Sequence, residues 1–220
     1  MIITIDGTAG SGKSTAARNL SDCLGIPFLD TGAMYRAVTL NAMKNNVNLE
    51  CEREMADIAG RTEFQVFPGT KSLVIRAGSE NITDEIRSEK VTRNVKHIAS
   101  SPAVRKILVS IQRRIGKDFG EFVTEGRDQG SVVFPSADYK FYLDAAPEER
   151  ARRRYEELDA RGENPDLDEI LGEIVARDRE DKNRETGPLV IPEGAVIIDT
   201  SGLDIEETRD KLMEYLELDT

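Results

Sequence analysis

Short apolar runs alternate along the chain with longer segments whose apolar positions recur at helical spacing. We expect the apolar runs to form five core strands: Met1–Asp6, Pro27–Leu29, Glu121–Glu125, Lys140–Asp144 and Ala195–Asp199. Four of them end in Asp or Glu, which is typical of buried parallel strands with a polar residue at the carboxyl edge. The expected helices are Lys13–Leu24, Ala33–Asn45, Arg87–Ser100, Ala103–Lys117, Glu148–Arg161, Leu167–Arg184 and Ile205–Leu218. The alternation predicts an α/β fold, a five-stranded parallel sheet flanked by helices.

One stretch departs from this alternation. Two β-rich runs, Phe64–Phe67 and Ser72–Arg76, flank Pro68–Lys71, which has the composition of a short turn. A hairpin cannot continue a right-handed parallel crossover, so we predict a small inserted subdomain over residues 49–86. The alternative is an edge hairpin of the main sheet with no ligand role. With 220 residues, the chain has room for a single large domain, residues 1–220, that carries this insertion.

The charge balance narrows the classes of ligand. Thirty basic residues against 41 acidic residues give a formal net charge of -11, so we expect no nucleic acid polymer as a partner. An anionic ligand must then bind in a local cationic cleft. Two cysteines and the single His97 exclude a disulfide scaffold and histidine-rich metal sites, and they indicate a reducing cytoplasmic environment. Since no cationic leader and no long apolar run occur, we expect neither export nor membrane insertion.

The segment after the first strand fits the phosphate-loop pattern G-x-x-x-x-G-K-[ST]. Its glycines let successive backbone N–H groups converge on phosphate oxygens, and the following helix directs its N-terminal dipole at the same anion. Lys13 then reaches the β- and γ-phosphates, and Ser14 offers its hydroxyl to Mg²⁺. The predicted nucleoside triphosphate site comprises Gly7, Thr8, Ala9, Gly10, Ser11, Gly12, Lys13, Ser14 and Thr15.

Arginines placed after strand ends indicate a second anion site. Arg36 and Arg127 follow the second and third predicted strands, whose carboxyl ends meet a cleft. Arg177, Asp181 and Arg184 recur on one face of a later helix. Guanidinium groups that converge from several segments suit a second phosphate, because each binds two oxygens at once and keeps its charge. Taken singly, an arginine fits a solvated surface or ion-pair residue better, but a position directly after a strand end favours the anion site.

Two charged helices joined by a turn with Gly and Pro follow the fourth strand. We predict a mobile lid over residues 148–166 that closes on the triphosphate and excludes water. Its candidate catalytic cations are Arg150, Arg153 and Arg154, which act together with Lys13 to neutralise charge on a phosphoryl group in transfer. The alternative is a pair of solvated helices held by i,i+4 ion pairs.

Six motifs extend these features over nearly the whole chain: Ile3–Gly7 before the phosphate loop, Leu29–Arg36, Thr83–Arg87, Glu125–Pro135, Phe141–Ala145 and Arg177–Arg184. Through them the chain resembles the bacterial-type cytidylate kinases, a family of nucleoside monophosphate kinases. The resemblance implies ATP as phosphoryl donor with Mg²⁺, CMP or dCMP as acceptor, and a place in pyrimidine nucleotide metabolism. It also implies a monomeric enzyme with a helical lid and an inserted subdomain on the monophosphate side.

The resemblance implies roles for residues on the phosphate side of the acceptor. Arg36 and Arg127 are expected to clamp the acceptor phosphate, and Thr31 lines the same pocket. Arg184 is expected to contact a phosphate in the closed state. Glu125, where the family also has Asp, is a candidate for ordering Mg²⁺ through water.

Other matching positions imply contacts with the base and the ribose. Arg105 and Asp128 are expected to read cytosine, because an Asp oxygen accepts from the exocyclic amine of cytosine and faces the O4 acceptor of uracil unfavourably. Arg177 and Asp181 are the expected ribose contacts. One departure is Lys96, where the family commonly has a small hydroxyl residue, so base selectivity stays open.

Two other functions fit parts of the pattern. The first is a kinase for another monophosphate such as UMP, with Lys96 as the altered feature. The second is a regulatory NTPase switch without an acceptor. The chain lacks the N-K-x-D guanine motif and carries arginines at the acceptor-side strand ends, and both observations disfavour the switch.

Overall fold

Five parallel strands form the central sheet of the computed structural model, which describes residues 1–65, 74–77, 80–82 and 85–216. Their order across the sheet is β2 (Phe28–Asp30), β6 (Phe122–Gly126), β1 (Ile2–Gly7), β7 (Tyr139–Asp144) and β8 (Val196–Asp199). The predicted parallel core is confirmed, and every strand end lies within one residue of its predicted position. The parallel register brings the acidic strand ends to one edge, with Asp30 beside Glu125 and Asp144 beside Asp199.

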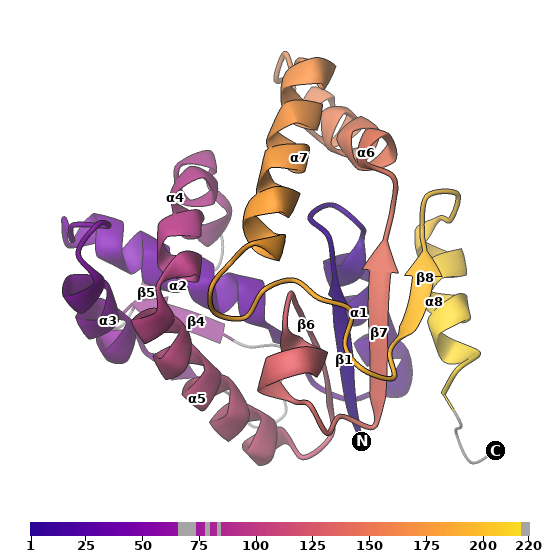
Figure 1. The fold of residues 1–220 in the computed structure, drawn as a ribbon, viewed down its shortest axis with the longest axis horizontal. Helices are drawn as coiled ribbons and strands as arrows, with labels where there is room; N and C mark the ends of the chain where they lie inside the picture. Colours follow the sequence, from indigo (N-terminus) through magenta and orange to yellow (C-terminus); the bar gives the residue numbers. More distant parts are fainter. Residues whose placement is uncertain (66–73, 78–79, 83–84, 217–220) are drawn as a thin grey trace.

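Helices flank this sheet in the order that the sequence predicts. The α-helices of the described chain are α1 (Lys13–Leu24), α2 (Thr31–Lys44), α3 (Glu52–Arg61), α4 (Glu89–Ser100), α5 (Pro102–Phe119), α6 (Pro147–Asp159), α7 (Leu167–Lys182) and α8 (Ile205–Met213). A 3₁₀ turn, η1 (Glu85–Arg87), and a π-helical turn, η2 (Gln129–Val133), complete them. Figure 1 shows α6 and α7 above the carboxyl ends of the strands, with α2 to α5 grouped to the left of the sheet.

Capping residues fix several helix ends. Helix α1 has the predicted bounds because Gly12 and Gly25 flank it in the left-handed region, at φ 83° and 72°. Helix α2 begins at Thr31 rather than Ala33, since the carboxylate of Asp30 accepts from the N–H of Ala33 at 2.8 Å.

Other helix predictions need correction: α4 begins at Glu89 instead of Arg87, and α6 ends at Asp159 instead of Arg161. Helix α3 was not predicted, and it buries only Met55 and Ala59, so its apolar stripe is short. Helix α7 ends at Lys182, which leaves Arg184 just beyond the helix. Helix α8 ends at Met213 instead of Leu218, and residues 217 and 218 lie outside the described chain.

The β-rich insertion forms a separate three-stranded antiparallel sheet. It consists of β3 (Phe64–Gln65), β4 (Val74–Ala77) and β5 (Glu80–Asn81), and Phe64 pairs with Ile75. The predicted pairing is confirmed, and the alternative of an edge hairpin in the main sheet is wrong. The predicted turn Pro68–Lys71, with Phe67 and Ser72, lies outside the described residues, as do Thr83 and Asp84 of the third motif. That residues 49–86 act as a subdomain remains a prediction.

Two buried apolar clusters pack on opposite faces of the sheet, because neighbouring strand residues point to opposite sides. Phe122 of β6 belongs to the cluster under α2 to α5, and Val123 belongs to the cluster under α1 and α8. Phe122 packs edge-on against Phe134, with ring centroids 5.1 Å apart. Among the described helices, none combines the length and apolar character that crossing a bilayer requires.

Candidate active site

The phosphate loop turns tightly between β1 and α1. Gly10 and Gly12 adopt φ 79° and 83°, a region that favours glycine. A Cβ on Gly7 would collide with the carbonyl oxygen of Leu143, so this glycine lets β1 run close against β7. The loop backbone therefore has the conformation that an anion-binding turn before a helix requires.

Three contacts hold the loop from its outer side. The hydroxyl of Thr8 donates to Asp144 Oδ1 at 2.8 Å, at the end of β7. The hydroxyl of Thr200 donates to the carbonyl of Ser11 at 3.0 Å, after the end of β8. Arg150 Nη1 donates to the carbonyl of Ala9 at 2.9 Å. The loop is thus fixed to the sheet edge before any ligand binds, which lowers the cost of ordering it.

Lys13 lies buried beneath this loop. Its Nζ donates to the carbonyl of Thr8 at 2.8 Å. Burial, followed by the charge of Arg127, lowers the pKa of Lys13 to about 7. Since the charge of Arg127 lowers the pKa of Lys13, the two predicted anion sites, one after β6 and one after β1, are close enough to interact electrostatically.

Ser14 and Glu125 form a small oxygen-rich group at the same edge. The Ser14 hydroxyl donates to Glu125 Oε1 at 3.0 Å. Burial, followed by the charge of nearby Asp30, raises the pKa of Glu125. Thr31 is buried beside them and donates its hydroxyl to the backbone oxygen of Glu125 at 2.7 Å. Hydroxyl and carboxylate oxygens are ligands that Mg²⁺ prefers, so this group fits such an ion.

The predicted acceptor-side arginines gather around one carboxylate. Arg127 Nε donates to Asp181 Oδ2 at 2.8 Å, and Arg184 donates to the other oxygen of Asp181. Burial, followed by the charge of Arg127, lowers the pKa of Arg177, which faces the same group. Three cations therefore surround Asp181, and Glu125 and Asp178 are further carboxylates near Arg127. A guanidinium cluster of this kind suits a bound anionic ligand.

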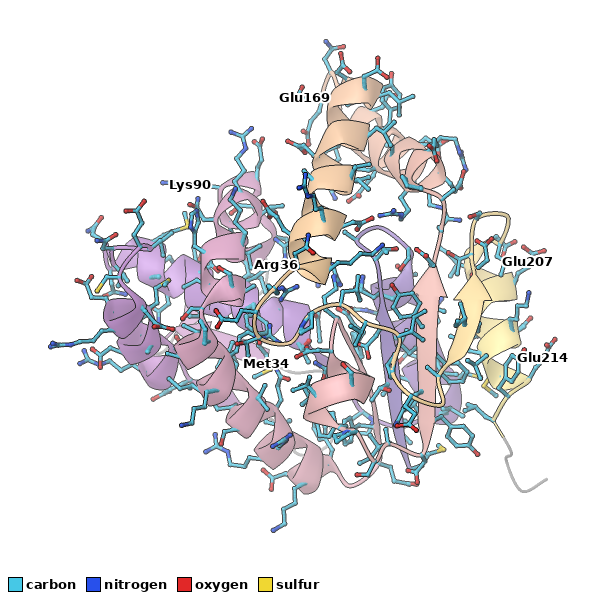
Figure 2. All side chains as sticks on the ribbon, in the orientation of Figure 1. Met34, Arg36, Lys90, Glu169, Glu207 and Glu214 are labelled. Carbon is cyan, nitrogen blue, oxygen red and sulfur yellow. The ribbon has the colours of Figure 1, made fainter. Side chains whose placement is uncertain are left out.

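Arg36 reaches this region from α2. Its Nη1 donates to Thr92 Oγ1 at 2.7 Å, and the side chain lies between α2, α4 and the end of α7 (Figure 2). Burial, followed by the charge of Arg87, lowers the pKa of Arg36. Arg36 also lowers the pKa of Arg177, so both belong to one electrostatic group.

The residues predicted to read the base form a buried ion pair with each other. Arg105 donates to Asp128, and both side chains are almost fully buried. The Arg105 guanidinium lies over the ring of Tyr35, 5.6 Å from its centroid. A Cβ on Gly187 would collide with both members of the pair, so the segment after α7 covers it here. Lys96 is exposed on α4.

The predicted lid arginines do not converge. Arg150 is buried and contacts the phosphate loop, Ala145 and, at 2.6 Å, Asp178 of α7. Arg153 donates to Glu149 and to the backbone oxygen of Thr200. Arg154 pairs with Glu157 at 2.7 Å on the exposed side of α6. Arg150 thus bonds to the loop and Arg153 lies near Gly12, whereas Arg154 pairs within α6.

Sequence reasoning missed several residues that build the site. Asp178 holds Arg150, Asp144 holds the phosphate loop, and Asp30 lies beside Glu125. The sequence could have indicated Asp30 and Asp144 as site residues, since each stands at the end of an apolar run that forms a strand. Asp178 lies inside the motif Arg177–Arg184, but nothing in this highly charged helix indicates that it pairs with Arg150.

Comparison with known proteins gives a consistent result. Residues 3–218 match the family model described as Cytidylate kinase. The cytidylate kinase of Caldanaerobacter subterraneus subsp. tengcongensis is 43% identical over 218 residues, which cover 99% of this chain and 95% of that protein. The cytidylate kinase of Clostridioides difficile is 42% identical over 218 residues, covering 99% of each.

Solved structures agree on the fold. A shikimate kinase from Bacteroides thetaiotaomicron has a TM-score of 0.50 at 14% identity, covering 99% of both chains. An uncharacterized protein from Eubacterium ventriosum has a TM-score of 0.51 at 14% identity, covering 98% of this chain and 97% of that one. At such identities the likeness concerns the fold alone.

Proposed function

The chain belongs to the cytidylate kinase family and is an ATP-dependent nucleoside monophosphate kinase, and from this premise we propose that it transfers the γ-phosphoryl group of ATP to CMP or dCMP. The products are ADP and CDP or dCDP. The observation that best supports the proposal is the proximity of two cationic sites at one sheet edge, with Lys13 on the donor side and Arg127 on the acceptor side.

The donor side uses main-chain groups and one ammonium. Amides of the phosphate loop and the N-terminus of α1 bind the β- and γ-phosphates, and Lys13 neutralises charge on the transferring group. The contacts of Thr8 and Arg150 keep the loop in place during transfer. The attacking phosphate oxygen of CMP is already ionised, so no general base is needed and alignment supplies much of the rate.

The acceptor side uses guanidinium groups. Arg36 and Arg127 hold the CMP phosphate in line with the γ-phosphoryl group, and Arg184 contacts a phosphate when the lid closes. Asp181 and Arg177 bind the ribose. When CMP binds, the Asp128 carboxylate, which pairs with Arg105 in the free enzyme, also accepts a hydrogen bond from the exocyclic amine of cytosine. Uracil has no donor at this position.

Ser14 is the proposed direct ligand of Mg²⁺, and Glu125 contacts the ion through water. Within residues 1–65, 74–77, 80–82 and 85–216 no group of three or more His, Cys, Asp or Glu side chains is arranged to hold a metal. The remaining ligands are then water and nucleotide phosphates, as is usual for Mg²⁺. The ion supplies charge neutralisation on the phosphates when bound.

The lid, residues 148–166, closes over the triphosphate. Arg150 acts mainly as its anchor, because it joins the base of α6 to the phosphate loop and to α7. Arg153 and Arg154 are the candidates that reach the phosphates after closure, since their present partners are a backbone oxygen and glutamates of their own helix. We also expect the enzyme to be monomeric and cytoplasmic and to act in pyrimidine nucleotide metabolism.

A coupled assay of ADP release with CMP, dCMP, UMP and AMP tests the proposal. We expect specificity constants for CMP and dCMP well above those for UMP and AMP. A preference for UMP would support the alternative in which Lys96 alters the base site. ADP release that is independent of any added monophosphate would contradict the proposed acceptor.

Binding of ATP at pH 8 is expected to take up protons. The pKa of Lys13 is lowered to about 7 in the free enzyme, so most of these amines are neutral at pH 8. A triphosphate favours the charged form and raises this pKa, whereas phosphate groups with a second pKa of about 6 are already ionised. Titration calorimetry in buffers of different ionisation enthalpy measures the uptake. Equal binding heats in all buffers would show that Lys13 is already charged in the free enzyme.

A further inference from the structure

Asp6, near the end of β1, is a buried carboxylate that the mechanism above does not use. Its side chain has no exposed surface. Oδ1 accepts from the N–H of Gln129 at 2.8 Å, and Oδ2 accepts from the N–H of Gly130 at 2.7 Å. Each oxygen thus binds one backbone amide, and the two amides belong to the first residues of η2.

These two amides need a partner from elsewhere in the chain. The first N–H groups of a helical turn have no partner within the turn, and the side chain of Asp128 does not cap η2. Leaving a buried amide unpaired costs about 1–3 kcal/mol. Burial raises the pKa of Asp6 to about 7, and both amides oppose this rise because they stabilise the charged form.

The turn that Asp6 holds carries two proposed acceptor-site residues. Arg127 and Asp128 lie between Gly126, the last residue of β6, and the two bound amides. A Cβ on Gly130 would lie 2.8 Å from Thr4 Oγ1 and 3.0 Å from Pro192, so the turn packs directly on β1. Neither Arg127 nor Asp128 is in a strand, so their backbone position depends on the contacts at each end of the turn.

We propose that Asp6 is a positioning residue for the acceptor site: by binding the amides of Gln129 and Gly130 it sets where the Arg127 guanidinium and the Asp128 carboxylate lie. The inference rests on the proposed roles of those two residues. Asp6 also directly precedes Gly7, so one residue connects the donor loop to the turn that binds the acceptor.

Asp6→Asn tests this with almost no change of volume. An amide oxygen can accept from one N–H, but the NH₂ group then faces the other N–H as a second donor. Loss of one hydrogen bond to a charged group corresponds to about a tenfold change or more. We expect the KM for CMP to rise and the CMP-to-UMP ratio of specificity constants to fall by about this factor, with the KM for ATP changed less than about twofold.

Asp144→Asn is the matched control. Asp144 ends the neighbouring strand β7 and holds the donor loop through Thr8. We expect this variant to weaken use of ATP and to leave the CMP-to-UMP ratio unchanged. A purely stabilising role for Asp6 would lower activity with all substrates together and would not move that ratio.

Gly130→Ala provides a second variant in case Asp6→Asn does not fold. The added methyl group moves the same amide away from Asp6 by contact with Thr4, without changing any charge. We expect the same fall in the CMP-to-UMP ratio. If a folded variant of either kind keeps the wild-type ratio and the wild-type KM for CMP, the inference is wrong. If Arg127→Ala also leaves CMP kinetics unchanged, the proposed role of Arg127 fails, whereas the proposed function fails only if the wild-type enzyme releases ADP independently of added CMP.

Discussion

Lys13→Ala is expected to lower kcat by about 10³-fold or more. The ammonium is buried under the phosphate loop, where the low dielectric makes its charge more effective than in water. The folded state is expected to persist, because burial and the charge of Arg127 disfavour the charged form of Lys13, and the variant removes this cost. The melting temperature without nucleotide should therefore equal or exceed that of the wild type.

Steady-state assays with saturating ATP and CMP measure this loss, and thermal unfolding measures the folded state. Lys140→Ala is a suitable control. In the described part of the chain, the one hydrogen bond that the Lys140 side chain donates goes to the backbone oxygen of Glu193, and this bond is exposed to solvent. It should retain wild-type kcat. A kcat of Lys13→Ala within about tenfold of wild type would contradict the role of Lys13 in neutralising the transferring group.

Arg127→Ala is expected to lower kcat/KM for CMP by about 10²–10³-fold, with a much smaller change in the KM for ATP. Arg127 contributes the guanidinium at the end of β6 that faces both Asp181 and the donor loop. Its removal leaves Asp181 with Arg184 and Arg177, so the acceptor pocket loses positive charge where the phosphate binds. The change in kinetic constants should be largest for CMP, because Arg127 follows β6, the strand on the acceptor side.

Initial rates over a grid of ATP and CMP concentrations separate the two substrates. Arg93→Ala is the matched arginine control, because Arg93 pairs with Glu89 on the exposed face of α4. Its kinetic constants should stay near those of the wild type. Unchanged CMP kinetics in Arg127→Ala would remove Arg127 from the acceptor pocket and would favour a kinase with a different acceptor geometry.

The sheet could be predicted well because its signals are local. Each strand is an apolar run that ends at a charged or glycine residue, and parallel strands buried on both faces need little else to be recognised. Helix α1 was predictable for a similar reason, since Gly12 and Gly25 mark its two ends in the sequence.

The parts that could not be predicted depend on partners distant in sequence. η2 forms where Asp6, from another strand, binds its first amides. The direction of Arg150 is set by Ala9 and Asp178, whereas Arg154 turns to Glu157. Four arginines within five positions look alike in the sequence, so only the packing of α6 against α7 distinguishes them.

The crowding of cations around Asp181 has a practical consequence for bench work. Inorganic phosphate and sulfate are anions of the kind that the arginines around Asp181 attract, so either ion in millimolar amounts competes with both nucleotides and raises the melting temperature. Affinities measured in phosphate buffer will therefore be underestimated. Crystals grown from ammonium sulfate should carry an oxyanion beside these arginines, which would mark the acceptor pocket before any nucleotide is soaked in.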